Sequence, residues 1–290
     1  MRLNLLHKEH IPAYKRLMRT DRPIGTLLLL WPTYWALWLA NSGVPSLDLL
    51  VIFSCGVFIM RSAGCVINDF ADRKIDGGVK RTAQRPLAIG EIKPGEALSL
   101  FCLLIVAAFF LVLMLNWQTV LLSIAALMLA ASYPFMKRYT HLPQVVLGMA
   151  YSFSIPMAFM ASIETVPGYA WLIFIANVFW TIAYDTMYAM VDRDDDLKIG
   201  VKSTAILFGK YDRHFIAMLN SAFVAIMVFV GITQTMSWPY FIGLAAAAIL
   251  LIMLQISIHS RDRMRCFQSF LNNNRVGMVV FIGVAFSYIL

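Results

Sequence analysis

Thiols and charged side chains are scarce in this chain of 290 residues. Charged residues make up 14% of it, and the four cysteines form no Cys-x-x-Cys pair. The cysteines are Cys55, Cys65, Cys102 and Cys266. We therefore expect small buried hydrophobic residues, not a disulfide framework. No cluster of His and Cys is present, which argues against a zinc site.

Motifs for nucleotide and nucleic-acid binding are also lacking. The segment Gly200-Val-Lys-Ser-Thr204 resembles the end of a phosphate-binding loop. The upstream glycine and the preceding strand of such a loop are absent, so we exclude that interpretation. No RNA- or DNA-binding motif accompanies the net charge of +8.

Apolar residues, by contrast, are abundant. They make up 60% of the chain, and the mean hydropathy is +0.72, whereas soluble domains are about 45–50% apolar. A membrane-spanning helix needs about 20 mostly apolar residues. This predicts an all-α polytopic membrane protein with about nine transmembrane helices in a bundle around a central cavity. The expected spans are 22–41, 47–67, 96–115, 118–136, 142–161, 169–190, 212–232, 238–258 and 274–290.

The basic residues predict the orientation. If the N-terminus faces the cytoplasm and the spans alternate, all Lys and Arg residues but Arg61 fall in cytoplasmic segments. This is a strong positive-inside pattern. It relates the net positive charge to orientation and to anionic lipid head groups, and not to nucleic acid. Functional residues concentrate on loops held by a rigid scaffold, so we expect the long loops 68–95 and 191–211 to form the working face.

The N-terminal segment 1–21 is charged and lacks an apolar core, so we do not expect a cleavable signal peptide. Two interpretations stay open for it, an interfacial helix and a disordered tail. The residues that would share one face of such a helix are Leu3, Leu6, His10, Tyr14 and Leu17.

Two acidic clusters lie 120 positions apart. The first reads Asn68-Asp69-x-x-Asp72-x-x-x-Asp76, and the second reads Asp185-x-x-Tyr188-x-x-x-Asp192-x-x-x-Asp196. The offset suggests four-helix repeats over 22–141 and 142–260 within a single domain 1–290, which would place the clusters opposite each other. Helical spacing puts 68, 72 and 76 on one face, and 185, 188, 192 and 196 on another.

Oxygen donors of this kind suit Mg²⁺ or Ca²⁺, and Mg²⁺ commonly combines one or two carboxylates with substrate phosphate oxygens. Basic residues are abundant nearby; they include Lys80, Arg81, Arg85, Lys137, Arg138, Lys198 and Lys202. Carboxylates, Mg²⁺ and cationic side chains together predict a diphosphate site. We expect Asp194 and Asp195 to be solvated and ion-paired, and we leave open a supporting role for Asp69. Asp185, inside a span, is either functional or paired with Arg61.

The two acidic motifs resemble those of the intramembrane aromatic prenyltransferases. Segments 22–32, 76–86, 133–138 and 184–196 are similar to the branch of that family that acts on 4-hydroxybenzoate in ubiquinone biosynthesis. The resemblance implies a polyprenyl diphosphate, with octaprenyl as the expected chain, 4-hydroxybenzoate as acceptor, Mg²⁺ as cofactor, and the bacterial inner membrane as location. A long prenyl tail favours lipid by about 0.8 kcal/mol per CH₂.

The resemblance also implies roles for individual residues. The expected metal ligands are Asn68, Asp72, Asp76, Asp192 and Asp196. Asp192, Tyr188 and Arg138 are the catalytic candidates. Asp192 would polarise the phenol or accept its ring proton, although a water or a diphosphate oxygen is an alternative acceptor. Substrate binding is expected at Lys80, Arg81, Lys137, Arg138 and Asp185. Arg81 is expected on the diphosphate, and Arg138, with Lys137, on the acceptor carboxylate. Binding of the diphosphate is the alternative for Arg138.

Two alternatives remain from the sequence. A prenyltransferase of the same fold with another acceptor, such as naphthoate, homogentisate or haem, would share the acidic motifs. A cation-coupled transporter would also use intramembrane acids and repeats. That class predicts charged groups near the middle of the membrane, whereas the acidic clusters here lie at the cytoplasmic ends of the expected spans.

Overall fold

A computed structural model describes residues 4–289, and every regular element in that range is a helix. The first half contains α1 (Ile11–Leu17), α2 (Ile24–Asn41), α3 (Leu47–Asp72), α4 (Pro94–Val112), α5 (Trp117–Met136), α6 (Pro143–Ser152) and α7 (Ser154–Ile163). The second half contains α8 (Gly168–Ile199), α9 (Thr204–Phe208), α10 (Asp212–Thr233), α11 (Trp238–Ser257) and α12 (Arg263–Ser287). Short 3₁₀ turns are η1 (Lys8–His10), η2 (Asp76–Gly78), η3 (Gly209–Tyr211) and η4 (Ile258–Ser260). The expected all-α membrane fold is confirmed.

The helices occupy each of the nine expected spans. Among the described residues, seven stretches are long and apolar enough to cross a membrane: 47–72, 94–112, 117–136, 143–163, 168–199, 204–233 and 238–260. The helices α2 and α12 have the expected positions but are not among those seven. The structure therefore confirms a multi-pass membrane protein but does not confirm the count of nine transmembrane helices.

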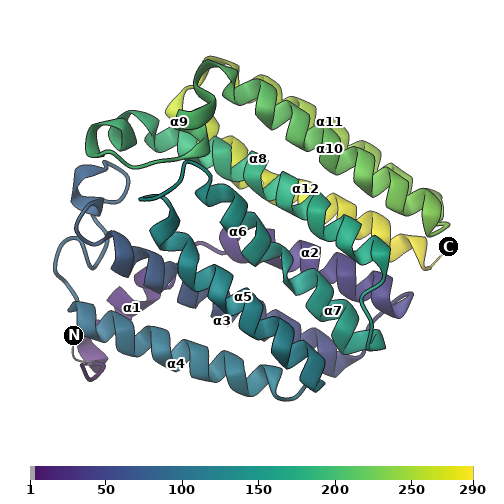
Figure 1. Cartoon of the computed structure of the whole chain (residues 1–290), viewed down its shortest axis with the longest axis horizontal. Helices are drawn as coiled ribbons and strands as arrows, with labels where there is room; N and C mark the ends of the chain where they lie inside the picture. The colour runs from purple at the N-terminus through teal and green to yellow at the C-terminus, as the bar shows by residue number, and fades with distance from the viewer. Residues whose placement is uncertain (1–3, 290) are drawn as a thin grey trace.

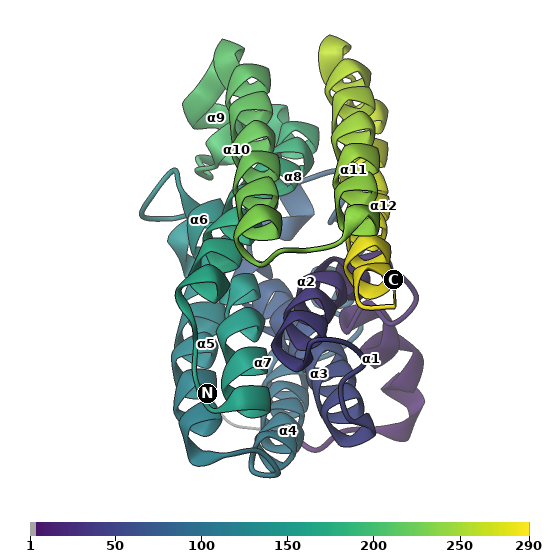
Figure 2. The same cartoon turned by 90° about the vertical axis from the view of Figure 1, so that its right-hand side faces the viewer.

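The helices form one bundle (Figures 1 and 2), with α4 and α5 at one edge and α11 and α12 at the opposite edge. Its core is built on Trp35 of α2, Trp180 of α8 and Phe223 of α10, whose ring centroids lie 5.5–6.0 Å apart. At the outer edge, α11 and α12 approach closely where Gly243 faces Gly283. A Cβ added to Gly243 would lie only 2.8 Å from the Cα of Gly283. Small residues allow such close packing where lipid supplies no hydrophobic driving force.

The expected span 142–161 is matched by the apolar stretch 143–163. Its helix breaks at Phe153, between α6 and α7, because Pro156 has no N–H to donate to the carbonyl of Ser152 four residues earlier. The expectation that all four cysteines are buried needs correction. Two of the four cysteines, Cys55 and Cys102, lie on the outer surface of the bundle, whereas the other two are buried. A surface that faces lipid accepts a small apolar thiol as readily as the core does.

Within residues 4–21, the N-terminal segment is helical over 8–17 and packs on the bundle. In α1, Ala13, Tyr14 and Leu17 are buried against residues of α3 and α4 and the intervening loop. Leu6 of the expected apolar face is exposed, and Leu3 lies outside the described residues. Of the two alternatives, the structure therefore favours a docked helix over a disordered tail.

The helices that carry the acidic clusters are longer than a bilayer is thick. At 1.5 Å per residue, the 26 residues of α3 span about 39 Å and the 32 residues of α8 span about 48 Å, against about 30 Å of hydrocarbon. Gly200, in the left-handed conformation at φ 72°, ends α8 directly after its acidic turn. Both C-terminal ends lie at the side of the bundle that carries loop 73–93 (Figure 1). The four-helix repeat stays a prediction.

Candidate active site

A cavity of about 1010 Å³ runs between the helices and contains the acidic clusters at one end. Its polar end is lined by Asn68, Asp69, Asp72, Asp76, Arg81, Arg85, Lys137, Asp192 and Asp196. Deeper along α3 and α8 it is lined by Arg61, Asp185 and Tyr188. The remaining wall is mostly apolar and includes long stretches of α4 and α5. The cavity therefore joins a charged mouth to an apolar groove.

The two acidic clusters reach this mouth differently. On α8, residues 185, 188, 192 and 196 share one helix, as expected. On the other side, α3 ends at Asp72, and Asp76 follows in the 3₁₀ turn η2. The prediction that 68, 72 and 76 share one helical face is thus wrong for Asp76. Gly77 and Gly78 disfavour continuing the helix, and the turn places the Asp76 carboxylate beside Arg85.

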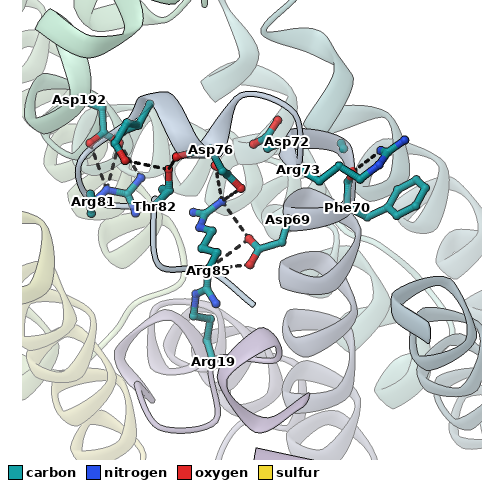
Figure 3. A network of polar contacts seen from close by, with 12 residues as sticks. Arg19, Asp69, Phe70, Asp72, Arg73, Asp76, Arg81, Thr82, Arg85 and Asp192 are labelled. Atoms are coloured by element: carbon teal, nitrogen blue, oxygen red, sulfur yellow. Dashed lines mark hydrogen bonds and ion pairs between the residues drawn. The ribbon is translucent and has the colours of Figure 1, made fainter. Parts of the chain in front are cut away.

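Acids of both clusters are paired with cationic side chains (Figure 3). The Lys137 ammonium pairs with Asp72 Oδ2. Arg81 donates to Asp192 from Nε and Nη2, at 2.6 Å for the shortest contact, and its guanidinium carbon lies 4.5 Å from the centre of the Tyr188 ring. These pairs remove most of the cost of placing acids beside the membrane.

Asp76 accepts two hydrogen bonds of 3.0 Å from Arg85 Nη1. Burial raises the pKa of the Asp76 carboxyl, and the Arg85 guanidinium opposes that rise. Arg85 also lies 2.9 Å from Asp69, so one guanidinium serves two buried carboxylates. Asp76 in loop 73–93 and Asp69 on α3 are therefore both held by a positive charge that comes from that loop.

The predicted metal ligands do not form a closed cage. Within residues 4–289, no three Asp, Glu, His or Cys side chains converge as a metal-binding group. The donor set nevertheless fits an open site for a hard cation, because all its ligands are oxygens and Asp72 Oδ1 is buried without a hydrogen-bond partner. Such a site would take a cation that shares its coordination with substrate phosphates.

Two predicted substrate-binding residues do not line the cavity. The Lys80 side chain is exposed at the surface. Arg138 Nη2 donates to the carbonyl of Ala71 at 2.6 Å, so this guanidinium is engaged at the end of α3 instead of facing the cavity. Asp194 and Asp195 pair with Arg263 as expected, but only Asp194 is solvated, because Asp195 is buried.

The structure brings forward two arginines that the sequence left undecided or passed over. Arg61 reaches the cavity from α3; its Nη1 contacts Cys65 Sγ, and its buried Nε has no hydrogen-bond partner. Among residues 4–289 it makes no ion pair, so the alternative in which Asp185 pairs with Arg61 is not formed. In the sequence, Arg85 is only one of several basic residues near the first cluster. Its place between two buried acids depends on how loop 73–93 folds, and no spacing rule signals it.

The chain is similar to known proteins over nearly its whole length. Residues 29–279 match the UbiA prenyltransferase family. A 4-hydroxybenzoate octaprenyltransferase from Pseudoalteromonas translucida is 65% identical over 288 residues, covering 99% of both chains. The apo structure of a UbiA homolog from Aeropyrum pernix K1 is similar in fold, with a TM-score of 0.80 at 25% identity, over 97% of this chain and 98% of that one. A UbiA homolog from Archaeoglobus fulgidus bound to GPP and Mg²⁺ has a TM-score of 0.69 at 18% identity, over 96% and 99% of the chains.

Proposed function

The chain belongs to the UbiA prenyltransferase family, and from that premise we propose that it transfers a polyprenyl group from polyprenyl diphosphate to 4-hydroxybenzoate. The new bond forms at the ring carbon ortho to the hydroxyl. The products are 3-polyprenyl-4-hydroxybenzoate and diphosphate, in ubiquinone biosynthesis. The observation that carries this proposal is one cavity that joins a mouth of carboxylates, Lys and Arg to an apolar groove. A lipid diphosphate matches both ends of this cavity, because its diphosphate suits the charged mouth and its tail suits the apolar groove.

The prenyl tail would occupy the groove between α4 and α5. Its wall is made of apolar side chains, among them Ile105, Phe109, Leu115, Ile124 and Leu127. Each CH₂ kept out of water is worth about 0.8 kcal/mol, so a long tail that continues into lipid would stay anchored there. Octaprenyl is the chain length that the name of the Pseudoalteromonas translucida relative carries, and we adopt it for this chain.

The diphosphate would lie at the mouth. Asn68, Asp72, Asp76, Asp192 and Asp196 would hold Mg²⁺, the ion bound together with GPP in the Archaeoglobus fulgidus homolog. When bound, Mg²⁺ neutralises charge on the diphosphate leaving group.

Lys137 and Arg81 support the same step. Each is paired with a carboxylate at the mouth, and each can exchange that carboxylate for a phosphate oxygen once a cation takes the acid. Their charges then favour cleavage of the allylic C–O bond, because stabilisation of developing charge is usually the largest catalytic term.

The acceptor would lie deeper, between α3 and α8. Arg61 lines the cavity and its buried Nε makes no hydrogen bond, so we assign it to the acceptor carboxylate in place of Arg138. Tyr188 and Phe270, with ring centroids 4.6 Å apart, form an aromatic wall where the allylic cation would develop. Ring attack forms the C–C bond, and the ring proton leaves to Asp192, to water or to a diphosphate oxygen.

The location follows from the charges. We propose a bacterial inner-membrane protein with the N-terminus, loop 73–93 and the cavity mouth in the cytoplasm. Support comes from the basic residues, which outside Arg61 all fall in segments that would face that side. Accessibility of single cysteines introduced at Lys80 and at Asn116 to a membrane-impermeant reagent in spheroplasts would test this, with labelling expected only at Asn116.

The function is tested with purified protein in liposomes. Octaprenyl diphosphate is supplied with 4-hydroxybenzoate, a dihydroxynaphthoate or homogentisate, with Mg²⁺ or with EDTA, and products are identified by mass spectrometry. We expect product only with 4-hydroxybenzoate and Mg²⁺. Product with naphthoate or homogentisate alone would instead assign another acceptor, and absence of any product with Mg²⁺ would refute prenyl transfer.

A further inference from the structure

Four charged side chains of alternating sign connect the N-terminal helix to the acidic mouth (Figure 3). Arg19 Nη2 lies 2.9 Å and 3.1 Å from the two oxygens of Asp69. Arg85 Nη1 lies 2.9 Å from Asp69 Oδ1 and 3.0 Å from both oxygens of Asp76. The order Arg19, Asp69, Arg85, Asp76 therefore runs from the turn after α1, through α3 and loop 73–93, to the turn η2. We call these four residues the relay.

The middle of the relay is shielded from water. The side chain of Asp69 is 1% exposed and that of Arg85 is 11% exposed. A buried charge is strongly unfavourable when its partner is removed, so the two positions depend on each other. Low local polarity also strengthens each contact in such a chain. A change at one end of the relay is therefore transmitted to the other end.

The outer end of the relay is held in place by the docking of α1. Tyr14 OH and His10 Nδ1 both contact Glu96 Oε2 of α4, at 2.6 Å and 2.7 Å. Leu17 is fully buried in the cluster formed with α3 and α4. Arg19 follows the helix in the left-handed conformation, at φ 57°, which is unfavourable for a residue other than glycine. Such conformations persist where the surroundings enforce them, and here the conformation aims the guanidinium at Asp69.

We propose that Arg19 and Asp69 are positioning residues for Asp76, so that the N-terminal helix is a working part of the site. Asp69 has two cations beside it, and Arg19 satisfies one side of its carboxylate. Arg85 can then divide its donors between Asp69 and Asp76, which fixes the Asp76 carboxylate at the mouth. Without Arg19, Arg85 is the only cation left to Asp69, is drawn toward it, and leaves Asp76 unfixed. This inference rests on the proposed function, because the proposed function assigns a metal cation to Asp76.

The proposal is tested with Arg19→Gln, matched to Arg16→Gln. Arg16 lies on α1 and pairs with Glu91 near the surface, outside the relay. Mn²⁺ binding is measured by electron paramagnetic resonance in the presence of inorganic pyrophosphate, alongside melting temperature and the Mg²⁺ concentration for half-maximal turnover. We expect Arg19→Gln to weaken Mn²⁺ binding roughly tenfold or more, the effect typical of residues that support metal ligands. Arg16→Gln should match the wild type.

Two further variants distinguish positioning from stability. Arg19→Lys, which keeps the charge, should recover part of the Mn²⁺ affinity, and Asp69→Asn should reproduce the loss. A lower melting temperature in Arg19→Gln with unchanged Mn²⁺ binding would overturn the proposal, as would Mn²⁺ binding equal to that of Arg16→Gln. The proposed function fails separately: a wild-type protein that binds Mn²⁺ with pyrophosphate but forms no prenylated product would refute the activity and leave the relay standing.

Discussion

Replacement of Arg61 by Met should raise KM for 4-hydroxybenzoate and leave KM for the polyprenyl diphosphate nearly unchanged. Arg61 lies seven residues before Asn68 on α3, about 10 Å deeper along the helix axis. Its Nε is buried without a partner, and a Cβ on Gly25 would lie 2.6 Å from Nη2. The space that Gly25 leaves is therefore filled by a guanidinium whose buried Nε makes no hydrogen bond.

The magnitude follows from the contacts that a carboxylate would make there. A hydrogen bond between charged groups contributes about 1.5–3 kcal/mol. At about 1.4 kcal/mol per factor of ten, loss of that contact lowers kcat/KM for 4-hydroxybenzoate roughly 10- to 150-fold. Stability should not fall, because Met removes a buried charge that lacks a partner. Gly25→Ala, which pushes the guanidinium aside without removing it, should have a smaller effect.

The assay compares 4-hydroxybenzoate with 4-hydroxybenzaldehyde, which has no carboxylate. Wild-type protein should prefer the acid, and Arg61→Met should lose most of that preference. Arg138→Met is the matched variant, since its guanidinium donates to the Ala71 carbonyl outside the cavity. If Arg138→Met abolishes the preference and Arg61→Met does not, the assignment of the acceptor carboxylate to Arg61 is refuted.

Three further predictions test other parts of the site and fold. Asp72→Asn and Asp192→Asn should each lower turnover at least about 100-fold without lowering the melting temperature, because each removes a charge opposite Mg²⁺ and diphosphate; wild-type turnover in both variants would remove the metal assignment. Ala126→Phe, on the apolar wall of the cavity, should reduce kcat/KM for octaprenyl diphosphate far more than for geranyl diphosphate, and equal losses for both donors would place the tail elsewhere. Gly243→Val should destabilise the protein by about 1–3 kcal/mol in reversible unfolding, because a Cβ there overlaps Gly283; an unchanged midpoint would show that α11 and α12 do not approach as closely as described.

The acidic mouth illustrates how a membrane protein keeps costly charges without a bound ligand. Asp72, Asp76 and Asp192 each have a cationic partner, supplied by Lys137, Arg85 and Arg81 respectively. A divalent cation and a diphosphate bring positive and negative charge together, so they can replace these pairs without leaving a buried charge alone. The described residues of α4 and α5 that line the apolar groove include no charged side chain.

Several features of this protein follow from its sequence alone. The apolar runs predict the helices, because a span in lipid must satisfy all its backbone hydrogen bonds internally. The spacing of Asp192 and Asp196 places both on one face of α8, since that helix continues without interruption to Ile199. Local rules of this kind also predict that hard oxygen ligands gather at the ends of two helices.

Contacts between distant segments were decided only by the tertiary structure. Asp76 left the expected helical face because loop 73–93 folds back to place Arg85 beside it. Arg61 lines the cavity and Arg138 does not, because the direction of each side chain depends on packing between helices and not on its neighbours in sequence. The pairing of Arg19 with Asp69 spans 50 positions and depends on how α1 docks. A sequence specifies which charges are present near the mouth, whereas the identity of their partners depends on three-dimensional proximity, which no spacing rule encodes.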